Sequence, residues 1–372
     1  MKLLYVCGTY CPSFGGAEIS MHTLIKQLKN SFGAEVLAVT DKRYTNNQSE
    51  GTYDGVNLAR VQHNNREKEI ESIIASFKPD AIITQLMWSD IALKIGKLKN
   101  IPTILRVCKI PFNLDISKKS EFSPTEIIAV SNAVSSYILK NFSRDSIILH
   151  PPVSLEKVLV SNHIKDYNPW NSEYILMFNP LGRKGGRIFK EIVQSFPNKK
   201  FAVVAGWASL KDPKTDEFSE DLLKRICYSL RTEYSGKKPE YVDFSNCPNV
   251  TILNPTEDVW KIYSKTKILL IPSQWEEAFG RVALEGLANG IPTLGSNVGG
   301  LKEALGSGGI IIDNYQTSSE WVSKIKKLDK KEYYSKISKM SKGSIDESII
   351  LDNVVKDFFN LLIKAINKFK VI

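Results

Sequence analysis

The chain has 372 residues, of which 42% are hydrophobic and 24% charged, a composition that excludes disordered and fibrous proteins. The length favours two domains of ordinary size. The net charge of +10 is compatible with binding to nucleic acid, to an anionic membrane or to an anionic substrate. A general excess of lysine without any such partner would also explain it. Because no arginine-rich tract, zinc-knuckle spacing or aromatic and basic RNA motif occurs, we expect no nucleic-acid partner.

The first part of the chain alternates short apolar runs with longer helical patterns, which is typical of a parallel sheet with helices on both faces. The runs that predict strands lie at 2–7, 35–40, 80–86, 102–107, 126–131 and 146–153. The first run breaks at Gly8, too early for the core of a signal peptide, so we read it as a buried strand.

A glycine-containing turn follows the first strand and leads into a predicted helix. Gly15 and Gly16 would let backbone N–H groups approach a ligand, and the helix N-terminus adds a partial positive charge. The spacing differs from that of a dinucleotide fingerprint and of a P-loop, and a plain tight turn is the alternative.

A second series of apolar runs predicts a second sheet, with strands at 174–179, 200–206, 249–254, 268–273, 292–296 and 308–313. Residues 156–173 break the periodicity and predict an interdomain linker. We therefore predict domains at 1–165 and 166–350, followed by an amphipathic helix at 351–372. Within 208–248 the helical spacing of apolar residues predicts an inserted helix between flexible loops.

The second series opens with a basic turn, where Arg183, Lys184 and Gly185 stand between a strand and a helix. A pyrophosphate at this turn would meet two cations and free amides. Each charge-assisted bond contributes ~1.5–3 kcal/mol, against ~0.3–1 kcal/mol for the helix dipole, so the cations should dominate. A solvated turn is the alternative, but open α/β sheets bind ligands at the carboxyl ends of their strands.

Two carboxylates, Glu277 and Glu285, stand eight positions apart in the stretch "EEAFGRVALE", where a helix is predicted to begin near residue 278 or 279 and to end at Gly290. At the helical rise, that spacing covers roughly 12 Å. One carboxylate could then contact a transferred sugar and the other the ribose of the same nucleotide. The alternative is that neither carboxylate binds a ligand. Glu277 would then be an acidic residue in the first turn of the helix, and Glu285 a surface residue on its polar face.

Residues beside this carboxylate pair could contact the diphosphate between the sugar and the ribose. The exposed amides near Phe279 and Gly280 would face its phosphates, and Arg281 could add a charge. For Arg281 a surface position near the helix start is an equal alternative.

These motifs resemble retaining glycosyltransferases of the GT-B fold, family 4 type, also called glycosyl transferases group 1. "EEAFGRVALE" matches the E-x7-E motif of that family, whose first Glu contacts the donor sugar and whose second contacts the ribose. The segments "FGGAE", "IIAVSNAV", "FNPLGRKGG" and "GIPTLGSNVGGLKEALGSGG" resemble further family segments in the same order along the chain.

The resemblance implies two Rossmann-like domains with parallel sheets facing an interdomain cleft, and a C-terminal helix that crosses back to the N-terminal domain. The first domain would bind a saccharide or lipid-linked saccharide acceptor, and the second a UDP- or GDP-linked sugar. The enzyme would be a retaining hexosyltransferase of cell-surface polysaccharide or glycolipid synthesis that needs no metal ion or other cofactor. The implied catalytic residues are Glu277, Lys184 and Arg183, and the implied donor-binding residues are Gly15, Gly16, Gly185, Phe279, Gly280, Arg281 and Glu285.

The chain departs from the family after the strand at 102–107, where many relatives carry a histidine. Arg106, Cys108 and Lys109 stand there instead and are the acceptor or reaction-centre candidates. An altered acceptor, another helper residue or lost activity would explain the change. The missing histidine also leaves open an inactive scaffold that binds a sugar or a protein. Epimerases and phosphorylases, which share the fold and its phosphate cleft, are the enzymatic alternatives to a transferase.

The remaining signals concern location. The five cysteines are odd in number and irregularly spaced, which favours free thiols in the cytoplasm. No run approaches the roughly 18 uncharged apolar residues of a spanning helix. The lysines of the final helix also allow peripheral contact with the inner face of an anionic membrane, although packing on the body of the protein is favoured.

Overall fold

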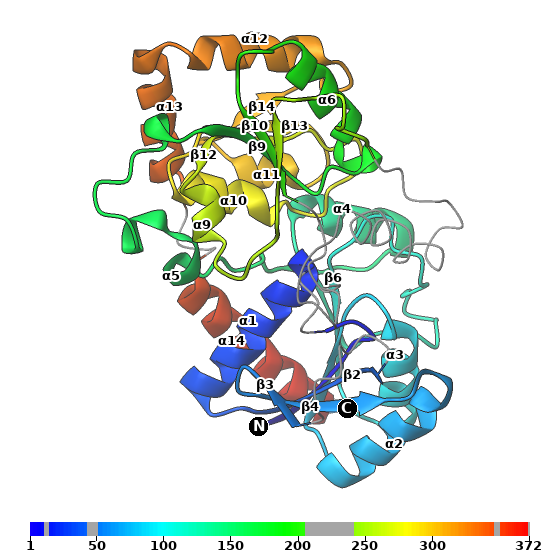
Figure 1. Ribbon diagram of the computed structural model, residues 1–372. Helices are drawn as coiled ribbons and strands as arrows, with labels where there is room; N and C mark the ends of the chain where they lie inside the picture. The colour runs from blue at the N-terminus through cyan, green and yellow to red at the C-terminus, as the bar shows by residue number, and fades with distance from the viewer. Residues whose placement is uncertain (11–14, 43–50, 205–241, 346–349, 371–372) are drawn as a thin grey trace. The chain divides into compact units, whose positions relative to one another are not determined.

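The computed structural model describes residues 1–10, 15–42, 51–204, 242–345 and 350–370 (Figure 1). Two compact units divide the chain, Met1–Pro152 with Glu347–Ile372, and Val153–Asp346. The inserted helix predicted within 208–248 falls largely at 205–241, outside the described residues. No helix of the described ranges has an apolar stretch long enough to cross a bilayer.

The first unit contains an eight-stranded sheet in the order β3-β4-β2-β1-β5-β6-β7-β8. Its strands are β1 (Lys2–Val6), β2 (Glu35–Asp41), β3 (Gly51–Tyr53), β4 (Val56–Val61), β5 (Ala81–Thr84), β6 (Thr103–Val107), β7 (Glu126–Ala129) and β8 (Ile147–Ile148). Its helices are α1 (Gly16–Phe32), α2 (Arg66–Phe77), α3 (Ser89–Leu98), α4 (Asn132–Phe142) and α14 (Leu351–Lys370), with a short 3-10 helix η2 (His63–Asn65). The six strands predicted for this half are all present.

The antiparallel hairpin β3–β4 was not predicted from the sequence. Its signal is the Asp54-Gly55 pair, where both residues have positive φ, 44° and 81°. Asp-Gly is a favoured pair for a tight hairpin turn with positive φ at both central residues. The other pairings in this sheet are parallel.

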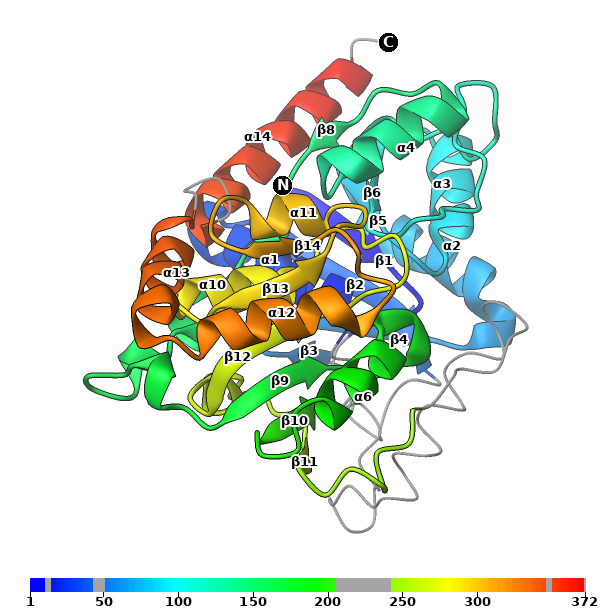
Figure 2. The ribbon, with the colours of Figure 1, turned by 90° about the horizontal axis from the view of Figure 1, so that it is seen from above.

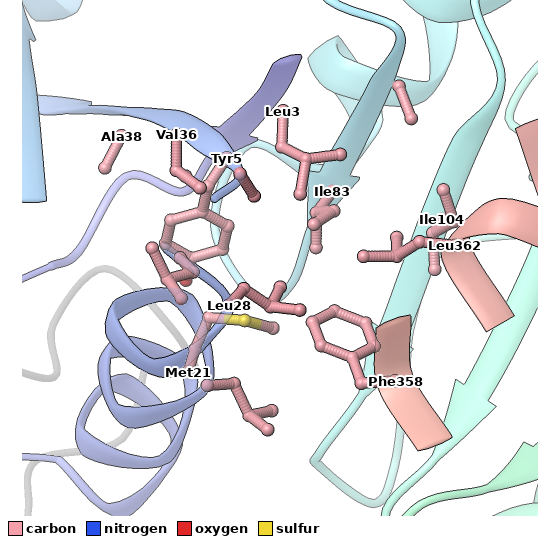
Figure 3. Packing of buried hydrophobic residues seen from close by; sticks show 14 of the residues in the cluster. Leu3, Tyr5, Met21, Leu28, Val36, Ala38, Ile83, Ile104, Phe358 and Leu362 are labelled. Carbon is pink, nitrogen blue, oxygen red and sulfur yellow. The ribbon is translucent and has the colours of Figure 1, made fainter. Parts of the chain in front are cut away.

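Alternate residues of the central strand β1 pack in two different cores, as expected for a strand covered on both faces. Leu3 and Tyr5 pack with residues of α1 and α14, and Leu4 and Val6 pack with residues of α2 and α3. In the first core, Phe358 and Leu362 of α14 lie among strand residues and α1 (Figure 3). The C-terminal helix therefore belongs to the first unit and completes its core.

The second unit contains a six-stranded parallel sheet in the order β11-β10-β9-β12-β13-β14. Its strands are β9 (Tyr174–Phe178), β10 (Phe201–Val204), β11 (Val250–Leu253), β12 (Thr266–Ile271), β13 (Thr293–Ser296) and β14 (Ile310–Ile312). All six were predicted. The 3-10 helices are η3 (Val160–Asn162), η4 (Pro169–Asn171) and η5 (Gly182–Lys184), and the α-helices are α5 (Leu155–Val158), α6 (Gly186–Gln194), α9 (Trp260–Tyr263), α10 (Arg281–Ala288), α11 (Leu301–Leu305), α12 (Ser318–Leu328) and α13 (Lys331–Gly343).

Helices lie on both faces of this second sheet. Figure 2 shows α6 and α12 side by side along one face. Ile268 and Leu270 of β12 share a core with these two helices, whereas Leu269 lies beneath Gly286 of α10. This alternation explains why the strands read as continuous apolar runs.

The segment predicted as a linker, 156–173, packs into the second unit. The side chain of Asn289 accepts a hydrogen bond from the backbone N of Val160 (2.8 Å) and donates to the carbonyl of Val158 (3.1 Å). Tyr167 donates to the carbonyl of Tyr263 (3.0 Å). These hydrogen bonds place the segment in the second unit, and the units divide after Pro152 rather than at residue 165. The sequence could not indicate this boundary, because bonds between distant residues leave no local pattern.

Candidate functional site

The basic turn Gly182–Lys184 follows β9 and lies against the loop that follows β12, the neighbouring strand. The backbone N of Gln274 donates to the carbonyl of Arg183 (2.9 Å). Gly185 has φ 87°, and an added Cβ would lie 1.8 Å from the carbonyl oxygen of Pro272. Only glycine fits this approach, which fixes Arg183 and Lys184 at the carboxyl edge of the second sheet.

Lys184 and Glu277 form an ion pair across the two loops. The Nζ atom of Lys184 lies 2.6 Å from Oε1 of Glu277, whose residue is only 7% exposed. The hydroxyl of Ser273 donates to the same carboxylate oxygen. Burial opposes ionisation, but the Lys184 ammonium and these hydrogen bonds outweigh it and lower the pKa of Glu277. The site thus holds an ionised carboxylate paired with Lys184, the sequence neighbour of Arg183.

Trp275 carried no recognisable signal in the sequence, and its ring contacts both cations. The guanidinium carbon of Arg183 is 4.1 Å from the ring centroid, and Nζ of Lys184 is 4.8 Å from it. Such contacts attract a cation to the face of an indole ring. The ring therefore helps to position both charged side chains.

The loop after β13 supports the backbone of Glu277. The N–H of Gly300 donates to the carbonyl of Glu277 (2.7 Å). Gly299 has φ 47°, and a Cβ there would lie 2.2 Å from the same carbonyl oxygen. The Gly299-Gly300 turn therefore holds the backbone of the catalytic candidate Glu277 in place.

Helix α10 begins at Arg281, later than predicted. Gly280 precedes it with φ 105°, a conformation that interrupts the helix, and Phe279 is buried. Glu277 therefore lies in the loop, so the 12 Å separation expected from helical rise does not apply. The separation from Glu285 depends on the loop instead.

Glu285 lies inside α10 and is buried, which rules out the alternative of a surface carboxylate. Tyr263 donates its hydroxyl hydrogen to Oε2 (2.7 Å), and Arg281 donates to Oε1 (3.1 Å). Burial and the nearby Glu285 charge raise the pKa of Tyr263, so that hydroxyl remains a donor. Each carboxylate oxygen keeps a second lone pair for a ligand hydroxyl. Tyr263 was also missed, because nothing in its sequence context marks it.

In the first unit, the glycine turn leads directly into α1. Gly15 is extended, with φ −73°, and Gly16 is the exposed first residue of the helix. Among the described residues, apart from its chain neighbours and its own helix backbone, no atom lies within 4 Å of a Cβ added to Gly16. The fold itself therefore does not require glycine at residue 16, which leaves room for the ligand contact expected there.

The reaction-centre candidates differ sharply in their surroundings. Arg106, on β6, is 1% exposed and donates to the side chains of Gln85 (2.8 Å) and Ser20 (2.9 Å). Cys108 and Lys109 follow β6 and are half-buried. Burial raises the pKa of the Cys108 thiol to about 11, so it is protonated at neutral pH. Arg106 can therefore act on a ligand only through the groups that it holds.

The described cysteines, Cys7, Cys108 and Cys247, are free thiols. Within the described ranges no cluster of three or more His, Cys, Asp or Glu side chains is placed to bind a metal ion.

The chain is similar to known glycosyltransferases. Residues 245–344 match the family described as Glycosyl transferases group 1. The chain is 24% identical, over 85% of its length and 82% of the relative, to an uncharacterized glycosyltransferase of Methanocaldococcus jannaschii. It is 25% identical to the capsular polysaccharide biosynthesis glycosyltransferase CapM of Staphylococcus aureus, over 56% of this chain and 54% of CapM.

Solved structures show the same fold at low sequence identity. Sucrose-phosphate synthase of Thermosynechococcus elongatus superposes with a TM-score of 0.75, 15% identity and coverage of 98% of each chain. HepE of Anabaena, solved with UDP-glucose, superposes with a TM-score of 0.71 and 14% identity, covering 98% of this chain and all of HepE. The chain therefore has the GT-B fold of the group 1 glycosyltransferases, with the sequence of that family over residues 245–344.

Proposed function

We propose that the chain is a retaining glycosyltransferase that moves a sugar from a nucleotide-diphosphate sugar to a hydroxyl of a saccharide or lipid-linked saccharide. The observation that carries the proposal is the Lys184–Glu277 ion pair beside Arg183, at the carboxyl edge of the sheet in the unit that matches the family. The solved complex of HepE with UDP-glucose supports a nucleotide-sugar donor. CapM, named for capsular polysaccharide biosynthesis, and WaaG, described as involved in lipopolysaccharide biosynthesis, support a role in surface glycans.

The mechanism follows from the charges of the second unit. As the bond between the sugar and the diphosphate breaks, negative charge develops on the leaving phosphate, and Arg183 and Lys184 would stabilise it. Glu277 would contact the transferred sugar, and Glu285 would accept hydrogen bonds from the ribose hydroxyls. The acceptor hydroxyl would attack from the face that the diphosphate leaves, so the anomeric configuration is retained. The two cations would neutralise the leaving group without a metal ion.

We also propose that the protein works in the cytoplasm, with peripheral contact to the inner face of an anionic membrane. The net charge of +10 supports electrostatic attraction to such a surface. Sedimentation with vesicles of phosphatidylglycerol and phosphatidylcholine tests this, because attraction should appear at low salt and weaken as salt is added. Equal recovery in the supernatant with and without anionic lipid would contradict it.

The transferase proposal is tested by incubating the protein with a panel of UDP- and GDP-sugars and saccharide acceptors, in the presence of EDTA. Transfer with retained anomeric configuration is expected, together with release of the nucleoside diphosphate. The Glu277→Gln variant is the matched control and should lose both. An isomerised donor would indicate the epimerase alternative, and cleavage that requires phosphate would indicate a phosphorylase.

A further inference from the structure

Two side chains at the carboxyl edge of the first sheet form a pair that has no role in the proposed donor chemistry. Asp41 ends β2, and His63 begins η2, directly after β4. The two strands are parallel neighbours, with Asp41 opposite Val61, so both side chains stand at the same edge. Oδ2 of Asp41 lies 2.8 Å from Nδ1 of His63.

This pair lies beside the beginning of the glycine turn. The backbone N of Asp41 donates to the carbonyl of Gly8 (3.3 Å), and the hydroxyl of Thr40 donates to the same carbonyl (3.2 Å). Gly8 follows β1 and leads toward Gly15 and Gly16. The pair thus borders the edge where an open α/β sheet binds its ligands.

The pairing with Asp41 determines which ring nitrogen of His63 can meet a ligand. The Asp41 side chain is fully buried, and its carboxylate can only accept, so Nδ1 of His63 donates to it; in the neutral ring this leaves the lone pair on Nε2. The His63 side chain is 31% exposed, and Nε2 has no partner among the residues that the structure describes. A hydrogen-bond acceptor of fixed orientation therefore remains available.

The backbone around His63 is held from both sides by the first turns of α2. Arg66 donates to the carbonyl of His63, and the N–H of Gln62 donates to the carboxylate of Glu69 (3.1 Å). His22, also in the first unit, is a useful contrast because both of its ring nitrogens are occupied. Nδ1 lies 2.7 Å from the hydroxyl of Tyr10, and Nε2 lies 3.1 Å from Oδ2 of Asp54. His22 is therefore a structural histidine, and His63 is not fully used by the fold.

We propose that Nε2 of His63, oriented by Asp41, accepts a hydrogen bond from a hydroxyl of the saccharide acceptor. The role as an acceptor site rests on the proposed function, whereas the binding of a saccharide hydroxyl does not. Saccharides offer many hydroxyl donors, and a neutral imidazole held in one tautomer can select one of them by direction. His63 is a binding residue in this proposal, and the sugar transfer itself needs no proton at Nε2.

Nitrogen-15 NMR of the histidine rings tests the binding directly, because the chain has four histidines and the His63→Gln variant assigns the signal. Wild-type His63 should show the Nδ1–H tautomer. Methyl glycosides of glucose, galactose, mannose and N-acetylglucosamine are the probes. At least one should move the Nε2 resonance of His63 saturably. The proposal is overturned if His63 carries its proton on Nε2, or if none of these glycosides moves its signal.

Variants separate binding from a structural role. Asp41→Asn and His63→Gln should each weaken binding of the active glycoside about two- to tenfold, the effect of one hydrogen bond. His22→Gln is the matched control, which should lower the Tm and leave glycoside affinity unchanged. Equal glycoside affinity in wild type and His63→Gln would overturn the proposal. UDP and GDP binding, measured on the same samples, tests the proposed function separately and should not respond to His63→Gln.

Discussion

The Nζ atom of Lys184 and Oε1 of Glu277 lie 2.6 Å apart, although 93 positions separate the two residues in the sequence. The contact joins the loop after β9 to the loop after β12 and pairs a buried carboxylate with Lys184, while Arg183 and Lys184 both contact the Trp275 ring. Cations that bind a diphosphate and a nearby carboxylate that binds a sugar are the groups that a nucleotide-sugar site requires.

Removing the ammonium should destabilise the second unit. In Lys184→Met the Glu277 carboxylate stays buried without its cation, so the free energy of unfolding should fall by about 1–3 kcal/mol. The double variant Lys184→Met/Glu277→Gln should recover part of that loss, because it no longer buries an unpaired charge. Urea unfolding at neutral pH measures all the variants. Simple addition of the two single effects would contradict the pairing.

The lowered pKa of Glu277 predicts a pH dependence with a definite sign. The folded protein holds the ionised form more strongly than the unfolded chain does, so this carboxylate adds stability above the ordinary Glu pKa of about 4.3. That contribution should disappear as the pH falls through the lowered pKa. The difference in unfolding free energy between wild type and Glu277→Gln should therefore shrink on acidification below about pH 4. A difference that stays constant over this range would contradict the prediction.

The Trp275 ring should matter for the arrangement of the two cations. Trp275→Leu removes both cation–π contacts, each worth about 0.5–2 kcal/mol, so affinity for a nucleoside diphosphate should fall about threefold or more. Trp275→Phe keeps an aromatic face and should retain most of the affinity. Calorimetric titration compares the two variants. Equal losses in both would show that the ring does not act through its contact with the cations.

Much of this arrangement could be predicted from the sequence, because buried parallel strands leave continuous apolar runs and the motifs are local. The twelve predicted strands and the association of Arg183, Lys184 and Glu277 with loops at the sheet edge follow from such signals. The β3–β4 hairpin was missed because β3 is only three residues long. The start of α10 was misplaced because Gly280 adopts a positive φ that interrupts the helix. The close neighbour there, 2.7 Å from an added Cβ, is Leu301, which is distant in the sequence.

Contacts between distant residues could not be predicted from local pattern. Trp275 and Tyr263 resemble ordinary aromatic core residues in the sequence, and only the fold brings them to Lys184 and Glu285. The pairing of Asp41 with His63 likewise requires the register of β2 and β4, and β4 itself was not predicted.

Two glycine-to-alanine changes should have opposite effects. Gly185→Ala places a methyl group on the carbonyl of Pro272 in a left-handed conformation, and should cost more than about 2 kcal/mol of unfolding free energy. In Gly16→Ala the added methyl group meets no other part of the described fold and stands at the first position of a helix, so the Tm should stay equal or rise. Because ligand approach is expected at Gly16, its variant should lose transfer activity while remaining stable. A fully active Gly16→Ala protein would remove this residue from the donor site.

Cys108 should not act as a nucleophile. Burial raises the pKa of its thiol to about 11, so very little thiolate exists at neutral pH. Cys108→Ser should therefore keep at least half of the wild-type transfer rate, and iodoacetamide should alkylate Cys108 slowly below pH 9. Complete loss of transfer in Cys108→Ser, with an unchanged Tm, would mean that the sulfur takes part in the reaction.

The central claim is that Arg183 and Lys184 bind the diphosphate of the donor. Calorimetric titration with UDP, GDP and the corresponding monophosphates tests it most directly. At least one diphosphate should bind wild type more tightly than its monophosphate. Arg183→Ala and Lys184→Ala should each reduce that diphosphate affinity about tenfold or more, the loss of a charge-assisted contact. Equal diphosphate affinity in wild type and both variants, or no binding of either diphosphate to wild type, would contradict the account.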